Sequence, residues 1–571
     1  MPTQLSVPIE CGGRKTYGYC TPEEQKAYQK MLVPPQRVIP VVFIPGIMGS
    51  NLRLSEGRQL VLKKSNNIAW RPDNATELKD FSFASAADRQ RQLDPDQTVV
   101  DTYDNGRAPT GDPTESSLKR HDVGAINVFL NYAPKSPLLT NDPPTSNPRF
   151  LVADKVRQRG WSEVFLSSYR KFLESCEKYL NSSIDNECWR AIIDHDPAEW
   201  AAVPSYSLQP LKRSEYQSVM KGCFFPVHAM GYNWLQGNKE SAKKLCDRVT
   251  SLIRKYQEAE FECHKVILIT HSMGGLVARA MIHPDMGGLK DKVLGVIHGV
   301  MPAAGSPAAY KRMRTGFEQD TVQSFVASFP LGHTGEHVTA VLGNSAGGLQ
   351  LLPSKAYGNG WLRVRHQKTL FNSFPQRGDP YEEIYKLGDR WYSLLREEWL
   401  NPADLPNAGV KHTHSLLDKA RLFHDELHQT YHPNTYAHYS ADEARPSWET
   451  ITWHLRTNFP GTNWNELAIE SDDGQGTLTL ASIPKDGRER KQWGKVKLGA
   501  STGEGDQTVP SRSSDHQLYA ANLRGVFRQR GYEHQASYND ESVLNATLYC
   551  VVRIAQQMVW PSTPTQKVST P

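Results

Sequence analysis

Short runs of consecutive apolar residues recur along the chain, and two of them end abruptly at small residues. One run covers residues 38–44 and is followed by Pro-Gly, and a second covers 266–269 and leads to Ser272, with two glycines at 274 and 275. After the second run, residues 274–282 are mostly apolar and suit a buried helix. Uninterrupted apolar runs predict strands that are buried on both faces, and their alternation with helices predicts an α/β fold with a mostly parallel central sheet.

The segment Thr270-His-Ser-Met-Gly274 joins the second strand to the helix. The order strand, sharp turn and helix is typical of a nucleophile elbow, in which the turn exposes a serine hydroxyl above the sheet. The usual pattern is G-x-S-x-G, and Thr270 replaces its first glycine. Small residues around Ser272 would let strand and helix approach closely, so we predict that Ser272 is a nucleophile.

A second serine matches the elbow pattern letter for letter, in Gly343-Asn-Ser345-Ala-Gly347. Its surroundings are unfavourable, because Pro353 follows eight residues later and would break the helix that an elbow requires. Ser272 is therefore the favoured nucleophile and Ser345 the alternative.

The first apolar run leads into a glycine-containing loop, Pro45-Gly-Ile-Met-Gly-Ser50. In α/β-hydrolases a loop after an early strand supplies one N–H of the oxyanion hole, and the residue after the nucleophile supplies the other. The predicted donors are the backbone N–H groups of Ile47 and Met273. The alternative for the loop is a glycine turn without a chemical role.

The acid and the base should follow the nucleophile in that order along the chain. Asp506 lies in a glycine-rich segment, and His534 precedes residues 543–554, which we predict to be a terminal helix. His534 would accept the serine proton and Asp506 would orient the imidazole. The alternative base is His516, and the alternative acids are Asp285, Asp291, Asp472 and Asp473, of which the last two fit a solvated turn.

Several segments resemble the lecithin–cholesterol acyltransferase-like lipases. They are the Pro45–Ser50 loop, Gly231-Tyr-Asn-Trp234, Gly348-Leu-Gln-Leu-Leu-Pro-Ser354, Thr435-Tyr-Ala-His-Tyr439 and Gly505-Asp-Gln-Thr-Val-Pro510, in which Gln507 stands where that family usually has glycine. The segment Thr270–Gly274 also resembles GPI-inositol deacylases. The resemblance therefore implies an α/β-hydrolase core and supports the Ser272, Asp506 and His534 triad.

The whole combination is similar to the type VI secretion lipase effectors, especially their branch with a GPI-inositol-deacylase-like core. That resemblance implies an A-type phospholipase that attacks membrane glycerophospholipids. It also implies a toxin delivered by the type VI secretion machinery into a rival or host cell, and a cognate immunity protein. Alternatives are a GPI-inositol deacylase-like enzyme, another lipid acyl hydrolase or an acyltransferase.

The core motifs are widely separated, which predicts a discontinuous hydrolase core at residues 36–53, 223–308, 415–440 and 495–560. Two insertions result, at 54–215 and 310–410. The first contains a predicted loop at 140–148 and a predicted helix at 161–180, and the second contains apolar residues at helical spacing in 381–395. Insertions at the carboxyl ends of parallel strands cover the active site in this class of fold, so we predict a cap or lid. The alternative is packing decorations remote from the site.

Composition limits the partners and the location. The chain has 571 residues, 38% of them hydrophobic, and a formal net charge of +5, which is too small over this length to indicate nucleic-acid binding. No apolar run is long enough for a membrane-spanning helix, and the first residues lack the features of a Sec signal. We therefore expect a protein without a Sec signal. The resemblance to type VI secretion lipase effectors implies that it is made in the bacterial cytoplasm and then secreted to act in the periplasm or membranes of a target cell.

The cysteines and histidines suggest no metal or cofactor. The eight cysteines are scattered and expected to be free thiols, with a Cys176–Cys188 bridge as the alternative. His424 and His428 have the spacing of a zinc-binding helix, with His432 beyond, but the acidic residues between them are out of register with H-E-x-x-H. A metallohydrolase is thus an alternative, as is a non-catalytic interaction protein. Nothing in the sequence indicates calcium.

Overall fold

The structure is a computed structural model. It describes residues 9–10, 15–19, 28–31, 37–103, 120–121, 152–182, 184, 187–319, 330, 332–388, 390–456, 464–483 and 491–561. The predicted loop at 140–148 lies outside these ranges. Residues 1–8, which were examined for a Sec signal, also lie outside them.

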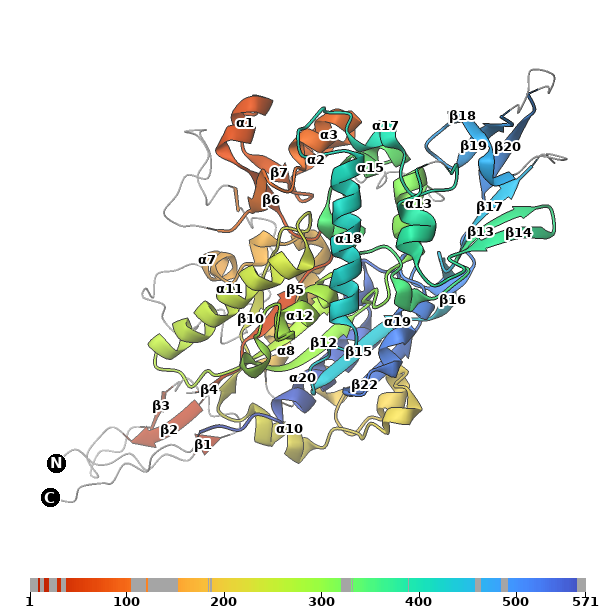
Figure 1. Ribbon diagram of the computed structural model, residues 1–571. Coiled ribbons are helices and arrows are strands. Elements are labelled where there is room, and N and C mark those ends of the chain that lie inside the picture. The colour runs from red at the N-terminus through yellow and green to blue at the C-terminus, as the bar shows by residue number, and fades with distance from the viewer. Residues whose placement is uncertain are drawn as a thin grey trace.

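A six-stranded sheet forms the centre of the molecule (Figure 1). Its order is β10 (Val227–Ala229), β5 (Val41–Ile44), β11 (Val266–His271), β12 (Val293–Gly299), β15 (Thr435–Ser440) and β22 (Leu523–Gln529). Every neighbouring pair is parallel. The predicted α/β fold with a parallel sheet is confirmed, and the two apolar runs supply β5 and β11.

The side chains of β5 show how this sheet is buried. Val42 and Ile44 belong to a core that includes α11 (Asn238–Glu258) and α12 (Gly274–Ile282). Val41 and Phe43 belong to a second core on the opposite face, with α8 (Leu166–Leu180) and α20 (Glu541–Ala555). Because alternate residues of a strand point to opposite faces, both faces need apolar residues, which explains the uninterrupted apolar runs.

The first predicted insertion does not form a single cap. Its first part holds a three-stranded sheet and three helices, namely β6 (Leu52–Leu54), α1 (Glu56–Leu62), β7 (Ile68–Trp70), α2 (Ala75–Ser82), α3 (Ala86–Gln92) and β8 (Thr98–Val100). Its later part contributes α8 and α10 (Arg213–Met220) to the face of the central sheet, where α10 contacts α20. The prediction of a cap over 54–215 is therefore wrong for residues 161–215, whose apolar side chains pack on the sheet. The predicted helix at 161–180 is present from Leu166.

The second insertion meets the first part of the first insertion. Its helices are α13 (Pro307–Thr315), α15 (Gly335–Leu342), α16 (Ala346–Leu349) and α17 (Glu397–Leu400). Helix α15 contacts both α13 and α3, so the two insertions form one assembly, with α18 (Val410–Leu427) beside it (Figure 1).

A second six-stranded sheet projects from the molecule (Figure 1), and the sequence analysis did not predict it. Its order is β14 (Thr369–Phe374), β13 (Leu362–His366), β17 (Ile451–Leu455), β20 (Trp493–Leu498), β19 (Thr477–Ala481) and β18 (Ala468–Asp472). Residues 495–498, which were assigned to the hydrolase core, belong to this sheet. A two-stranded ribbon of β16 (Asp442–Ser447) and β21 (Gly503–Gly505) follows β15 and precedes the predicted acid.

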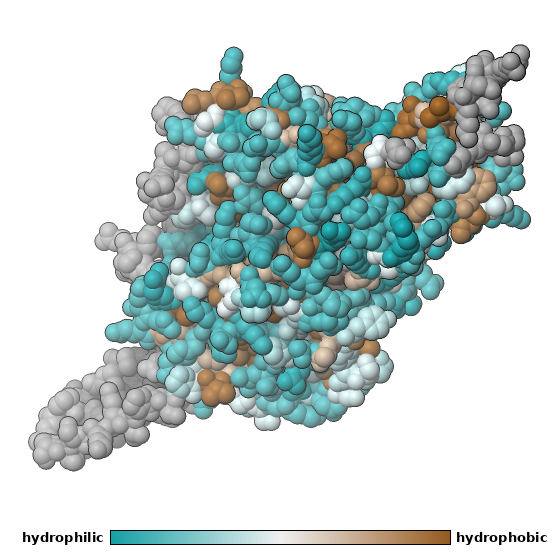
Figure 2. Space-filling view, viewed as in Figure 1, coloured by the Kyte–Doolittle hydropathy of each residue, from teal (hydrophilic) through white to brown (hydrophobic). Residues whose placement is uncertain are grey.

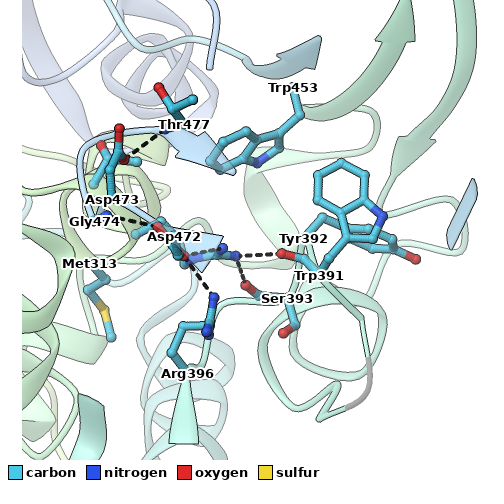
Figure 3. Close-up of polar contacts among 12 residues, drawn as sticks. Met313, Trp391, Tyr392, Ser393, Arg396, Trp453, Asp472, Asp473, Gly474 and Thr477 are labelled. Carbon is cyan, nitrogen blue, oxygen red and sulfur yellow. Dashed lines mark hydrogen bonds and ion pairs between the residues drawn. The ribbon is translucent and has the colours of Figure 1, made fainter. Parts of the chain in front are cut away.

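The helix predicted over 381–395 is present only as one wide turn at Tyr381–Tyr385. Beyond it, side chains from α13 bind backbone carbonyls that a helix would have used. Arg314 donates to the carbonyl oxygen of Trp391 over 3.1 Å and to that of Ser393, and the Tyr310 hydroxyl donates to that of Tyr392. Figure 3 shows the irregular segment Trp391–Ser393. The helical prediction was wrong here because the apolar residues pack inward from an irregular segment.

The remaining described elements are short and lie outside the central sheet. They are β1 (Ile9–Glu10), β2 (Lys15–Tyr19), β3 (Tyr28–Met31), β4 (Arg37–Val38), β9 (Cys223–Phe224), α7 (Val152–Gln158), α9 (Glu187–Arg190) and α19 (Ser511–Ser514). Within the described ranges no helix is long and apolar enough to cross a membrane. Cys176 and Cys188 are both free, so they form no bridge. The face shown in Figure 2 is largely hydrophilic, with hydrophobic residues in small separate groups.

Candidate active site

Ser272 occupies a strained turn between β11 and α12. Its φ is +53°, a left-handed conformation that non-glycine residues rarely adopt, and its N–H donates to the carbonyl oxygen of Gly299 over 2.8 Å. Gly274 must lack a side chain, because a Cβ there would lie 2.5 Å from the carbonyl oxygens of Ile44 and Pro45. The elbow predicted from the sequence is present, with its serine directed out of the end of β11.

The imidazole of His534 lies against this serine. Its Nε2 is 2.8 Å from Ser272 Oγ, and the residue lies in the loop between β22 and α20. Its backbone N–H donates to the carbonyl oxygen of Asp506 over 2.9 Å. The base loop is therefore attached directly to the acid loop.

Asp506 completes the constellation behind the imidazole. Its Oδ2 is 2.7 Å from His534 Nδ1, while its Oδ1 accepts the N–H groups of Thr508 at 3.0 Å and Val509 at 2.6 Å. A carboxylate can only accept hydrogen bonds, so the proton resides on Nδ1 and leaves Nε2 free to accept the serine proton. Gln507 has a φ of +72°, which explains why related loops prefer glycine at this position.

The loop after β5 lies directly against the nucleophile. A Cβ on Gly46 would be 3.0 Å from Ser272 Cβ. Met273 is the N-cap of α12, so its N–H lies at the positive end of the helix dipole, where negative charge is favoured. The role of the backbone N–H groups of Ile47 and Met273 as an oxyanion hole stays a prediction.

The alternative nucleophile has a structural role. Ser345 is fully buried and caps α16, because its Oγ accepts the N–H of Gly348 over 3.1 Å and donates to the carbonyl oxygen of Leu235 over 2.8 Å. The alternative base, His516, packs its ring against His428 and Tyr519 rather than against Ser272.

The alternative acids lie in other surroundings. Asp472 is buried and forms an ion pair with Arg396 over 2.8 Å, so its predicted place in a solvated turn is wrong; Asp473 does cap a turn, through the N–H of Thr477 (Figure 3). Asp285 and Asp291 lie beyond the end of α12, in the segment before β12.

The histidines of α18 are not arranged as a zinc-binding pair. The helix ends at Leu427, whose carbonyl oxygen accepts a hydrogen bond from Arg279 over 2.8 Å, so His428 lies beyond the last helical turn. His424 Nε2 contacts the carbonyl oxygen of Gln350 at 2.8 Å. In the part of the chain that the structure describes, no group of three or more His, Cys, Asp or Glu could hold a metal ion.

A narrow apolar cavity lies between the two insertions, next to the loop that follows β5. Its lining includes Met48, Trp70, Phe81, Leu93, Val338 and Leu342, with Arg89 and His337 as polar members. Met48 belongs to the loop after β5, in which Gly46 lies against Ser272. Phe83, two residues after the lining Phe81, is 78% exposed.

Sequence reasoning missed two residues of the site. His271 precedes the nucleophile, and its Nδ1 lies 3.1 Å from the hydroxyl of Tyr169 on α8. Because these residues are 102 positions apart, no local pattern could have paired them.

The chain is similar to known proteins in sequence and in fold. A family model described as a PGAP1-like alpha/beta domain matches residues 228–350. The chain is also similar to a solved structure described as "The crystal structure of Tle4-Tli4 complex", with 30% sequence identity and a TM-score of 0.69, over 91% of this chain and 99% of that chain. No curated protein matches the sequence. Because the structural similarity covers nearly the whole chain, it extends to the insertions.

Proposed function

The chain belongs to the family of type VI secretion lipase effectors that includes Tle4, and we propose that it is an A-type phospholipase working through Ser272, Asp506 and His534. The observation that carries this proposal is the unbroken hydrogen-bonded series from Asp506 Oδ2 through the imidazole to Ser272 Oγ, at 2.7 and 2.8 Å.

The geometry supports a two-step acyl transfer. Ser272 Oγ attacks the ester carbonyl carbon while its proton moves to His534 Nε2, and the oxyanion lies at the N–H groups of Ile47 and Met273. Collapse of this intermediate breaks the bond to the alcohol, which leaves as lysophospholipid with the proton from the imidazolium. Water, deprotonated by His534, then attacks the acyl-serine and releases the fatty acid.

The apolar cavity is the proposed site for an acyl chain. Its lining comes from both insertions and from Met48, so a chain bound there would extend from the oxyanion loop into the cap. The cavity is too narrow to hold a long acyl chain as it stands, so the cap must open to admit one. We therefore expect faster hydrolysis of vesicles and micelles than of dissolved short-chain esters, since an interface would stabilise the open cap.

Partners and delivery follow from the family. The structure that this chain matches is a complex of Tle4 with Tli4. By analogy, we propose that a cognate immunity protein binds this chain and closes its site, and that the secretion machinery delivers the enzyme from the producing bacterium to the membranes or periplasm of a target cell. We propose no metal or cofactor, so EDTA should leave the rate unchanged.

Lipid mass spectrometry tests the substrate proposal. Purified protein and its Ser272→Ala variant are incubated with vesicles of phosphatidylethanolamine and phosphatidylglycerol. The proposal expects lysophospholipid and free fatty acid from the wild type alone. Release of phosphorylated head groups, or activity confined to water-soluble esters, would contradict it.

A further inference from the structure

A buried hydrogen-bonded series runs behind the nucleophile and joins three segments that the reaction requires. The N–H of Gly46, in the loop after β5, donates to the hydroxyl of Tyr169 over 3.4 Å. That hydroxyl lies 3.1 Å from His271 Nδ1, and His271 Nε2 lies 3.0 Å from the carbonyl oxygen of His534. The oxyanion loop and the base loop are thus connected through α8 and the residue before Ser272.

The chemistry of each atom fixes the direction of these hydrogen bonds. The carbonyl oxygen of His534 can only accept, so His271 Nε2 carries the ring proton and donates it. His271 Nδ1 is then an acceptor, and the hydroxyl of Tyr169 must donate to it. The same hydroxyl oxygen accepts from Gly46, so every hydrogen bond in the series has one donor and one acceptor.

Burial keeps both side chains in the neutral forms that this arrangement needs. His271 and Tyr169 are each 1% exposed. Burial, with the neighbouring His534 as a smaller cause, lowers the pKa of His271 to about 3, and burial raises the pKa of Tyr169 to about 12. His534 becomes positively charged during the reaction, and its ring centroid is 5.0 Å from that of His271. A neutral His271 therefore does not repel this charge.

The surrounding backbone is shaped to admit these two side chains. A Cβ on Gly49 would lie 2.8 Å from the hydroxyl oxygen of Tyr169, and a Cβ on Gly46 would lie 2.9 Å from His271 Nδ1. The two glycines of the loop after β5 therefore leave room for the Tyr169 hydroxyl and the His271 ring.

We propose that His271 and Tyr169 are positioning residues that hold the base loop and the oxyanion loop in register around Ser272. His534 is then fixed on both sides of its backbone, by its N–H to Asp506 and by its carbonyl oxygen to His271. This inference rests on the proposed serine mechanism, but it concerns geometry that the triad residues do not set by themselves.

The test measures how fast a fluorophosphonate labels Ser272, together with the fraction of molecules that become labelled. Tyr169→Phe removes only the hydroxyl, and His271→Leu removes both hydrogen bonds of the ring. His271→Gln retains a donor and an acceptor on one planar group. We expect the rate constant for labelling of Ser272 to fall about 10- to 100-fold in Tyr169→Phe and further in His271→Leu, because a small displacement of the reacting groups slows the reaction strongly. His271→Gln should recover part of this loss.

Tyr256→Phe is the matched control, because the hydroxyl of Tyr256 also contacts a buried histidine of the central sheet, His228 Nε2, at 2.9 Å. It should label at the wild-type rate. If Tyr169→Phe lowers only the labelled fraction and leaves the rate constant unchanged, the two residues merely support the fold and the inference is wrong. Should His271→Leu fail to fold, Tyr169→Phe and His271→Gln still decide the matter. Failure of the wild type to label would instead overturn the proposed function.

Discussion

Replacing Asp506 by Asn should disable the base without disturbing the fold. Two backbone N–H groups, of Thr508 and Val509, donate to Oδ1 of Asp506. Because these N–H groups need an acceptor, the amide oxygen of the new asparagine should occupy the position of Oδ1. The NH₂ group then takes the position of Oδ2, which lies 2.7 Å from His534 Nδ1.

The size of the effect follows from this fixed orientation. An NH₂ group donates, so His534 must offer an unprotonated Nδ1 and carry its proton on Nε2, facing Ser272 Oγ. In that tautomer the imidazole cannot accept the serine proton. The same exchange in a serine-protease triad lowers kcat by about 10⁴-fold, which corresponds to about 5.5 kcal/mol of transition-state stabilisation, and we expect a loss of that order here.

The assay is hydrolysis of a chromogenic short-chain ester at pH 7, with circular dichroism to verify folding. Asp473→Asn is the control, because Asp473 also accepts hydrogen bonds from two backbone N–H groups, of Gln475 and Thr477, and was one of the alternative acids. It should retain wild-type kcat. An Asp506→Asn enzyme within tenfold of the wild type would refute the assigned tautomer and the role of Asp506.

Three further outcomes are expected. Ser345→Ala removes the N-cap of α16, so urea denaturation should show a free energy of unfolding lower by about 1 kcal/mol. The rate of Ser272 labelling should be unchanged, and loss of labelling would contradict the structural role of Ser345. Gly274→Ala places a Cβ 2.5 Å from two backbone oxygens of the strand β5 and its loop, so kcat should fall by about 10²-fold or more, and normal turnover would contradict the packing of the elbow. Burial lowers the pKa of three histidines of the central sheet to about 3, far below the ordinary 6.5, so the unfolded chain binds more protons than the folded chain between these two pH values. The free energy of unfolding should therefore decline as pH falls from about 6.5, by up to about 1.4 kcal/mol per pH unit for each ring, and urea titrations showing equal stability at pH 7 and pH 5 would contradict this. The three are His271, His298 and His438.

The parts of the site that could be predicted lie on short, locally determined segments. The strand before Ser272 needs apolar residues on both faces, and the elbow needs glycine where Gly274 meets a backbone carbonyl. These requirements appear within about ten residues of sequence. The order of nucleophile, acid and base along the chain then narrowed the choice among many histidines to His534.

The parts that could not be predicted depend on contacts between distant segments. The apolar stripe of α8 gives no indication of whether it covers a sheet or a cap, and only the folded chain places it beneath Phe43. The second sheet pairs strands from either side of α18, such as β13 with β17. Asp472 looked like part of a solvated turn because Arg396, with which it forms an ion pair, is 76 residues away.

The central claim is that Ser272 is the activated nucleophile of a working triad. The most direct test is peptide mass spectrometry after reaction with a fluorophosphonate, comparing the wild type with His534→Ala. The account predicts one adduct, on the peptide that contains Ser272, formed rapidly in the wild type and hardly at all in His534→Ala. An adduct on Ser345, or equal labelling of Ser272 without the imidazole, would contradict it.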